Sequence, residues 1–417
     1  MSSRAASALV VLAPALVACQ GETGTIALGL TTAPGSAVLD PVERLQVRLT
    51  NPPAVFEATR TDDGFRLAIE VDETDESGAL IVNGYDGGGA LVATGASPAF
   101  PVAAIDARIV VYMATPMSVE LAPVSLEQPR TELAAAPLAY GALLAGGRLA
   151  TGEPSAAISI YNAFDHSLVE GMPMPAARAG LAAGVGPSGR VYLFGGHDAA
   201  DAPTGTLWRF DTTVPPRGVY AQLGERPELA RADQTMVPIG TERFLVSGSP
   251  PLEITATSLA PRTDIASLGA SGASVAGTDG VPAAVFAGDS GLVRFRAETF
   301  TLLDPQARPG ARTAALPGGQ VLVVDETGAA LRVDVATGEV VPLPALVPAA
   351  CAAPTLAVTS RHLVLGCESS THVHDVATLE PLATIQRGGS VLAALPNDQV
   401  LLASGDALAL FTPPPLE

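Results

Sequence analysis

The sequence predicts an all-β protein in which a small β-sandwich precedes a seven-bladed β-propeller. Two observations carry this prediction. The 417 residues contain 42 Gly and 36 Pro spread along the chain, which favours many short turns between strands. After about residue 118, short apolar segments recur in steps of about 37 to 49 residues, which is the range of a four-stranded propeller blade.

The N-terminus carries a predicted export signal. Residues 1–18 combine Arg4 with an apolar run and a small-residue cleavage site, as a signal peptide does. Residues 16–19 read LVAC, which resembles the bacterial lipobox, and this resemblance implies cleavage before Cys19 and a diacylglycerol on its thiol. Gln20 is not the aspartate linked to inner-membrane retention. We therefore expect an exported protein, anchored to the outer membrane through a tether of residues 19–24.

Charge and motifs argue against several classes of function. The formal net charge is −19, and no basic cluster is present that would bind nucleic acid. The chain has no Walker loop, no HExxH, no CxxC and no GxGxxG after a strand, so the usual signatures of nucleotide, metalloprotease or redox chemistry are missing.

Residues 25–115 are the predicted sandwich domain. Apolar segments such as ERLQVRLT and ARIVVYMA are separated by acidic or glycine-rich turns, which predicts six or seven antiparallel strands in an Ig-like or prealbumin-like arrangement. The acidic stretch at 70–78 is loosely similar to a Ca²⁺ loop, but it lacks the central Gly and terminal Glu and is interpreted as a solvated turn.

Residues 117–417 are the predicted propeller. A strand ending in an aromatic or β-branched residue recurs seven times, and each occurrence follows a strand that ends in a polar turn, beginning with RLATGE and RVYLFGGHD. The last repeat contains only three strands. We expect segment 117–130 to supply its fourth strand and so close the ring.

The second repeat resembles a kelch repeat. Arg178 precedes its first strand, Gly195 and Gly196 close the second, and Phe210 with Asp211 closes the third. The resemblance covers the first two repeats and implies the blade structure alone, because kelch propellers serve both as binding scaffolds and as enzymes.

The stretch FAGDSG at 286–291 contains the Gly-Asp-Ser-Gly run that surrounds the nucleophile of chymotrypsin-like proteases. In the repeat it occupies the position of LFGGHD. We therefore expect a hairpin turn between the second and third strands of the fourth blade, and no catalytic role for Ser290.

One loop face of the propeller is the candidate binding face. The turns after second strands carry acids and the connections into first strands carry arginines, and both lie on the same side of a propeller. Either the two sets pair between blades, or the acids hold Ca²⁺ or a basic partner. The longest loop, 195–205, is the candidate specificity element. The predicted face comprises Glu153, Asp198, Asp289, Asp325, Glu368 and Asp406 with Arg178, Arg231, Arg312 and Arg387.

Cysteine and histidine positions complete the candidates. Cys351 and Cys367 flank a predicted hairpin, which favours a disulfide over two buried thiols. His372 and His374 share one face of a strand and are weak metal candidates, with a packed pair as the alternative.

These features predict a non-catalytic recognition or scaffold lipoprotein of the cell envelope that uses no cofactor and binds a protein or a glycan through the loop face. A propeller enzyme acting on polysaccharide or a related polymer is the alternative. A structural envelope protein that assembles through its sandwich is a third interpretation.

Overall fold

The computed structural model describes residues 23–61, 65, 69–72, 76–102, 108–349, 351, 353–404 and 407–415. Cys19 and Asp406 of the predicted sites lie outside these residues, as do residues 73–75 of the acidic stretch. The described chain is all-β, with one short 3-10 helix, η1 (Pro227–Leu229). No helix among the described residues is long and apolar enough to cross a membrane.

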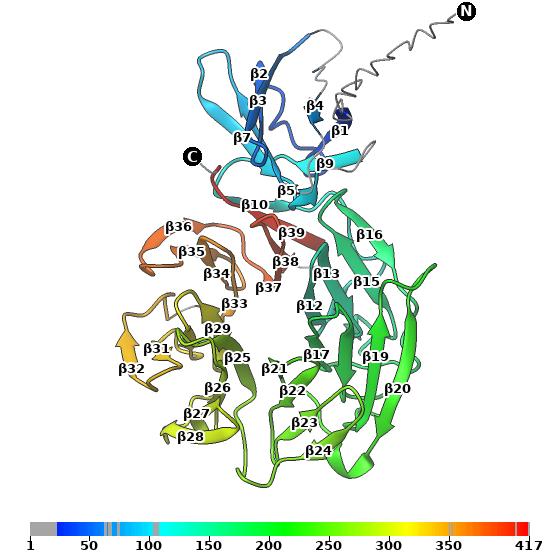
Figure 1. The fold of residues 1–417 in the computed structure, drawn as a ribbon, viewed down its shortest axis with the longest axis vertical. Helices are drawn as coiled ribbons and strands as arrows, with labels where there is room; N and C mark the ends of the chain where they lie inside the picture. Colours follow the sequence, from blue (N-terminus) through cyan, green and yellow to red (C-terminus); the bar gives the residue numbers. More distant parts are fainter. Residues whose placement is uncertain are drawn as a thin grey trace, which may run out of the picture.

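The first nine strands form an N-terminal unit, drawn in blue and cyan in Figure 1. They are arranged in a three-stranded sheet (β4-β1-β9), a four-stranded sheet (β3-β2-β6-β7) and a two-stranded sheet (β5-β8). The strands are β1 (Thr23–Thr31), β2 (Arg44–Leu49), β3 (Ala54–Thr59), β4 (Ile69–Asp72), β5 (Ser77–Gly78), β6 (Leu80–Tyr85), β7 (Leu91–Ala96), β8 (Phe100–Pro101) and β9 (Arg108–Tyr112).

One apolar core joins the two larger sheets of this unit. Residues of β2 alternate between half-buried and buried, and Val47 packs in the same core as Ile26 of β1 and Val111 of β9. The prediction of a wholly antiparallel unit with six or seven strands was wrong. β1 pairs with β9 in parallel, and the chain between these two strands serves as the long crossover that a parallel pair requires.

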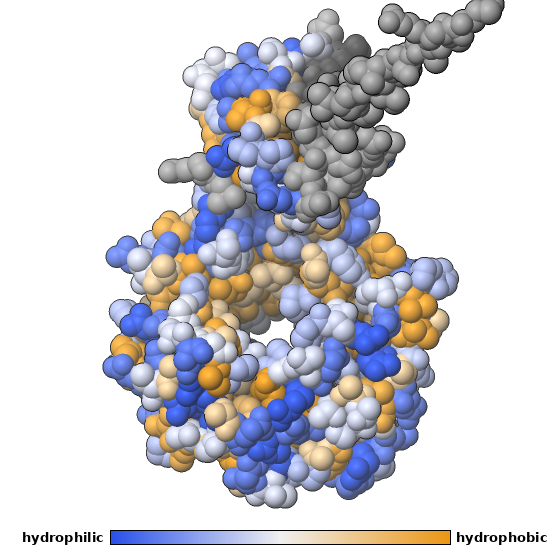
Figure 2. Space-filling model, viewed as in Figure 1, coloured by the Kyte–Doolittle hydropathy of each residue, from blue (hydrophilic) through white to orange (hydrophobic). Residues whose placement is uncertain are grey.

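Residues 118–412 build seven antiparallel four-stranded sheets. Figures 1 and 2 show them following one another around a central opening. The first four sheets are β12 (Ala134–Leu138), β13 (Gly141–Ala145), β15 (Ile158–Asn162) and β16 (Ser167–Glu170); β17 (Ala182–Val185), β18 (Val191–Phe194), β19 (Thr206–Asp211) and β20 (Val219–Glu225); β21 (Met236–Gly240), β22 (Arg243–Val246), β23 (Leu252–Ile254) and β24 (Leu259–Pro261); and β25 (Ser271–Ala276), β26 (Pro282–Gly288), β27 (Gly291–Arg296) and β28 (Thr299–Asp304).

The last three sheets follow the same order of strands along the chain, except that the seventh takes one strand from an earlier segment. They are β29 (Arg312–Leu316), β30 (Gln320–Val324), β31 (Ala330–Asp334) and β32 (Val340–Leu343); β33 (Thr355–Val358), β34 (His362–Gly366), β35 (Thr371–Asp375) and β36 (Pro381–Ile385); and β37 (Ser390–Ala394), β38 (Val400–Ser404) and β39 (Ala407–Thr412) with β10 (Ser118–Leu121).

The seventh sheet is completed by β10, which precedes the first sheet in the sequence. β10 runs antiparallel to β39, with Val119 opposite Phe411. This is the pairing expected from the incomplete last repeat, and it covers the edge that β39 would otherwise expose.

The expected second strand of the first repeat was wrong. The sheet uses β13, whereas the predicted segment RLATGE contributes only β14 (Arg148–Leu149), which pairs with β11 (Arg130–Thr131) outside the sheet. Gly146 and Gly147, which follow β13, both have a positive φ, so the chain turns out of the sheet there.

Candidate binding site

The acidic turns and the arginine connections meet on one face, called the loop face below. Isolated β-bridges join the turn after a second strand to the connection that leads into the next sheet: Ser155 pairs with Arg178, and Thr204 pairs with Arg231. In the first three sheets, the turns and the connections that the repeat pattern selected are therefore neighbours in space.

Three of the arginines on this face are committed to neighbouring protein groups. Arg130 is 8% exposed, and its guanidinium donates to the main-chain oxygens of Gly146 and Ala157 at 2.8 and 2.9 Å and to Ser159 Oγ at 2.8 Å. Each bond satisfies a polar group at the end of a strand, where the regular ladder stops. Arg130 thus fixes the start of the first sheet.

Arg178 and Arg231 are used in a similar way. Arg178 donates from Nε to Thr204 Oγ1 at 3.0 Å, and its guanidinium lies 5.2 Å from the ring centre of Trp208. Arg231 donates from Nη1 to the carbonyl oxygens of Ser247 and Pro250, both at 2.9 Å. These arginines hold consecutive sheets together through main-chain and hydroxyl acceptors.

Two of the predicted acids cap their own turns. Asp198 Oδ1 accepts the amides of Ala202 and Ala200, and these hydrogen bonds, together with the charge of Arg178, hold the pKa of Asp198 below its usual range. Asp325 Oδ1 accepts the amide and the hydroxyl of Thr327. Both side chains act as local turn formers.

The interpretation in which these acids pair with these arginines was wrong for the described residues. None of the ion pairs there joins a predicted acid to a predicted arginine, because the arginines meet nearer main-chain acceptors. The described residues also contain no group of three or more His, Cys, Asp or Glu side chains placed to hold a metal ion.

Two cavities open on the loop face and share Arg312. The first, of about 580 Å³, lies where the first strands of the first, fifth, sixth and seventh sheets approach one another, so it belongs to the central opening. The second, of about 270 Å³, lies between the third, fourth and fifth sheets. Of the ten predicted residues, Arg312 borders both cavities, Glu368 the first and Asp289 the second.

The run around Ser290 is a turn, as predicted. Gly288 ends β26 and pairs with Gly291, which starts β27 with φ +85°. Ser290 Oγ is buried at the wall of the second cavity and has no hydrogen-bond partner. A nucleophilic serine requires a base in contact with its hydroxyl, and none of the residues that line this cavity is a histidine.

The two cysteines that flank the predicted hairpin form a disulfide. Cys351 and Cys367 are bonded, with their Cα atoms 5.3 Å apart. Pairing of Thr355 with Gly366 in the β33–β34 hairpin brings the two cysteines to the same end of the sheet. Cys367 borders the first cavity, so the disulfide fixes part of its wall.

The histidine pair is packed inside the sixth sheet. His374 lies within hydrogen-bond distance of two main-chain oxygens, at 2.8 Å from Leu346 and 3.1 Å from Leu379. His372 contacts the hydroxyls of Ser370 and Thr384. Each ring nitrogen already has a protein partner, so the geometry favours the packed alternative over a metal site.

Loop 195–205 is bonded to neighbouring segments and lines neither of the two loop-face cavities. His197 Nε2 lies 3.1 Å from Asp233 Oδ2, and this carboxylate raises the pKa of His197. Asp201 pairs with Arg148 at 2.9 Å, which ties the loop to the first sheet. The candidate specificity element is therefore bound on both sides by its neighbours.

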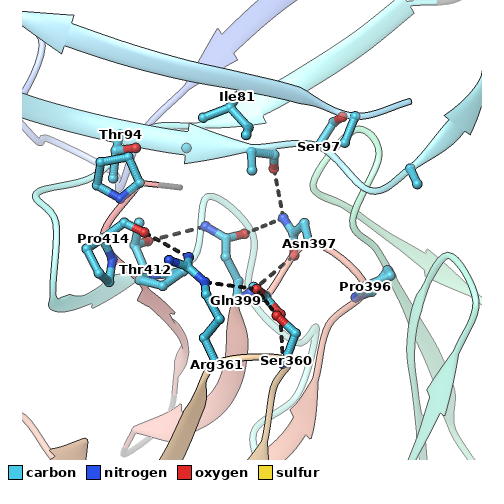
Figure 3. Close-up of a pocket in the computed structure, with 17 residues that line it drawn as sticks. Ile81, Thr94, Ser97, Ser360, Arg361, Pro396, Asn397, Gln399, Thr412 and Pro414 are labelled. Atoms are coloured by element: carbon cyan, nitrogen blue, oxygen red, sulfur yellow. Dashed lines mark hydrogen bonds and ion pairs between the residues drawn. The ribbon is translucent and has the colours of Figure 1, made fainter. Parts of the chain in front are cut away.

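Sequence reasoning missed a cavity of about 260 Å³ between the N-terminal unit and the seventh sheet, drawn in Figure 3. Asn397 Nδ2 donates to the carbonyl oxygen of Ala96 at 3.0 Å, and Arg361 donates to that of Pro414 at 2.9 Å. Ile81 and the prolines of the C-terminal segment supply apolar walls. The only sequence signal was the run of prolines 413–415.

No protein-family model matches the chain, and no curated protein matches it. The fold defines an all-β protein whose repeated sheets frame two cavities on one face, with Arg312 at the wall of both.

Proposed function

We propose that the protein is an exported recognition module, lipid-anchored at Cys19 to the outer membrane, in which a β-sandwich carries a seven-bladed kelch-like β-propeller. Seven consecutive antiparallel sheets with the same strand order support the propeller, as does completion of the last sheet by β10. The shared core of the sheets β4-β1-β9 and β3-β2-β6-β7 supports the sandwich.

The loop face is the proposed binding surface, and the observation that carries it is the pair of cavities joined by Arg312. Binding sites are concave and present a few polar groups with directed hydrogen-bonding capacity. The other loop-face arginines described above already bond the protein, whereas Arg312 faces both cavities. Rigid sheets behind the loops would keep this surface in place.

A non-catalytic role fits the same residues. No histidine lies beside Ser290 in the second cavity. Two acids, Glu132 and Glu368, border the first cavity, and Glu132 forms an ion pair with Arg148 at 3.1 Å. Hydrolysis of a polymer such as polysaccharide requires two groups of opposed protonation state acting on one bond. The ion pair of Glu132 therefore favours recognition over the alternative of an enzyme.

Site-specific photocrosslinking in cells tests the binding surface. A benzophenone amino acid at Ala270, an exposed residue that lines the second cavity, should give a discrete adduct of higher mass. The matched control places the same group at Leu302, which is 56% exposed on the outer strand of the same sheet, and should give none. Equal adducts at both positions, or none at Ala270, would contradict a binding role for the loop face.

Fractionation tests the anchor. Cys19→Ala should move the protein from the membrane fraction to the soluble fraction. An unchanged distribution would remove the lipoprotein proposal without affecting the proposed binding surface.

A further inference from the structure

Arg312 differs from Arg130, Arg178 and Arg231, whose side chains bond neighbouring segments. Arg387, which also precedes a first strand, is exposed and borders neither cavity. Its Nη1 donates only to the carbonyl oxygens of Gly310 and Ala311, in its own segment, at 3.3 and 3.1 Å. Neither Nε nor Nη2 has a partner among the described residues, and no described carboxylate pairs with it. Arg130, in contrast, makes three short bonds with two nitrogens.

An arginine with unused donors at a cavity wall is suited to a carboxylate. The guanidinium presents a planar fork of N–H groups that matches two carboxylate oxygens. Arg312 is half-buried and borders both cavities, so an anion entering either of them meets it. Partial removal from water strengthens such a bond relative to one on the open surface.

Ser290 provides a second, independent indication in the same cavity. Its Oγ is buried and unpartnered, and leaving a buried hydroxyl without a partner is unfavourable. Ser290 borders the second cavity, so a turn about its Cα–Cβ bond would present this hydroxyl to an acceptor oxygen of a ligand there. Arg312 and Ser290 thus offer donors to one ligand group.

The surrounding charges restrict which anion fits. Asp289 and Glu368 are exposed, border the cavities on either side of Arg312 and have no ionic partner among the described residues. The chain as a whole carries a net charge of −19, which repels a polyanion. The complementary ligand has one acidic group with basic groups near it. No aromatic side chain lines either cavity, so neither offers a ring face on which a sugar can stack.

We propose that the loop face binds a peptide segment of mixed charge, in which one Asp or Glu side chain enters at Arg312 and flanking basic residues meet Asp289 and Glu368. This rests on the proposed recognition function and specifies its ligand. The carboxylate accepts from Arg312 and from the Ser290 hydroxyl, and no covalent step is involved.

Peptide titration tests the inference on the mature full-length chain in detergent. The probes are Arg-Ser-Glu-Ser-Arg and Arg-Ser-Gln-Ser-Arg, capped at both ends and followed by calorimetry. The glutamate peptide should bind at least about tenfold more tightly than the glutamine peptide. Arg312→Gln should abolish this difference, and Ser290→Ala should reduce it. Arg217→Gln is the matched control, since it replaces an exposed arginine away from both cavities, and should leave the difference unchanged.

The inference fails if both peptides bind equally, or if the difference survives Arg312→Gln in a protein with an unchanged melting temperature. If trigalacturonate binds through Arg312 and the glutamate peptide does not bind, the carboxylate belongs to a glycan. This result would overturn the proposal of a peptide ligand. Crosslinking from Ala270 separates the two proposals. If an adduct forms but the two peptides bind equally, the proposed recognition function stands and the proposed carboxylate ligand is wrong. If no adduct forms and neither peptide binds, both proposals are wrong.

Discussion

Ser118 of β10 pairs with Thr412 of β39, so segments from the two ends of the repeat region lie in one sheet. Next to this pair, Val119 is 5% exposed and packs in a core cluster with Phe411 and Val400. The contact completes the seventh sheet with a strand that precedes the first sheet in the chain, through the backbone ladder and an apolar core shared with the sixth sheet.

Disruption of this contact should destabilise the seventh sheet and the sheet packed against it. Val119→Asp places a charge in the cluster and is expected to lower the free energy of unfolding by about 3 kcal/mol or more. Urea denaturation followed by circular dichroism measures the change. Val169→Asp on β16 is the control, because Val169 is 49% exposed and its replacement should change the stability by less than about 0.5 kcal/mol. Equal effects of the two substitutions would show that the pairing of β10 with β39 does not stabilise the repeated sheets.

The disulfide should contribute to stability through the loop it closes. Cys351 and Cys367 are 16 residues apart, and replacing both by Ser should lower the free energy of unfolding by about 2–4 kcal/mol. Reductant should lower the free energy of unfolding of the native protein by the same amount and should leave that of the double variant unchanged. An effect of reductant on the double variant would contradict this account.

A network of ion pairs joins the third and fourth sheets. Glu253, whose side chain is 18% exposed, accepts from Arg243 at 2.7 Å and from Arg262 at 2.8 Å, and Arg243 also pairs with Glu298. Glu253→Gln should lower the free energy of unfolding by about 1–2 kcal/mol, with a smaller loss at high salt because the pairs are partly screened.

The control for the network is Glu228→Gln, which removes the exposed pair with Arg226. We expect no measurable change in the melting temperature, since isolated surface pairs contribute little. A loss as large as that of Glu253→Gln would show that the network has no special role.

Acid should weaken the junction between the N-terminal unit and the first sheet. His166 Nε2 accepts the amide of Tyr112 at 3.2 Å, and burial lowers the pKa of His166 from its usual 6.5 to about 4. Between these pH values the unfolded chain binds more protons than the folded chain. The stability is therefore full above about pH 6.5 and declines as the pH falls towards 4.

The comparison is between the native protein and His166→Asn, since asparagine tolerates the positive φ of this position. From pH 7 to pH 4 the native protein should lose up to about 3 kcal/mol more than the variant, as measured by denaturation at each pH. His197→Asn is the control. Asp233 raises the pKa of His197, so its replacement should not lessen the loss at acid pH. Equal losses in native protein and His166→Asn would contradict the assignment.

The strands and turns were largely predictable because their signals are local. The seven recurring strands of the sequence coincide with the third strands of the seven sheets, and the turn at Ser290 lies where the repeat put it. The second strand of the first repeat was wrongly placed at RLATGE. Gly146 and Gly147 indicate a turn, but the sequence does not show that this turn ends the second strand of the sheet.

The site was only partly predictable. The repeat pattern selected Arg312, Asp289 and Glu368 but gave no reason to separate them from Asp198 or Asp325, which cap their own turns. Nothing in the sequence singled out Ser290 as an unpartnered donor, or the bond from Asn397 to Ala96, because these depend on distances between segments far apart in the chain.

The sequence by itself determined the all-β class, the repeat length, the position of most turns and the pair of cysteines that join, since turn residues and alternating apolar positions act over a few neighbours. The tertiary structure decided which partner each charged side chain has. A guanidinium bonds whichever acceptor lies within about 3 Å, and the packing of one sheet against the next determines that acceptor. For Arg130 the acceptors are main-chain oxygens and a serine, whereas the unused donors of Arg312 lie at the wall of two open cavities.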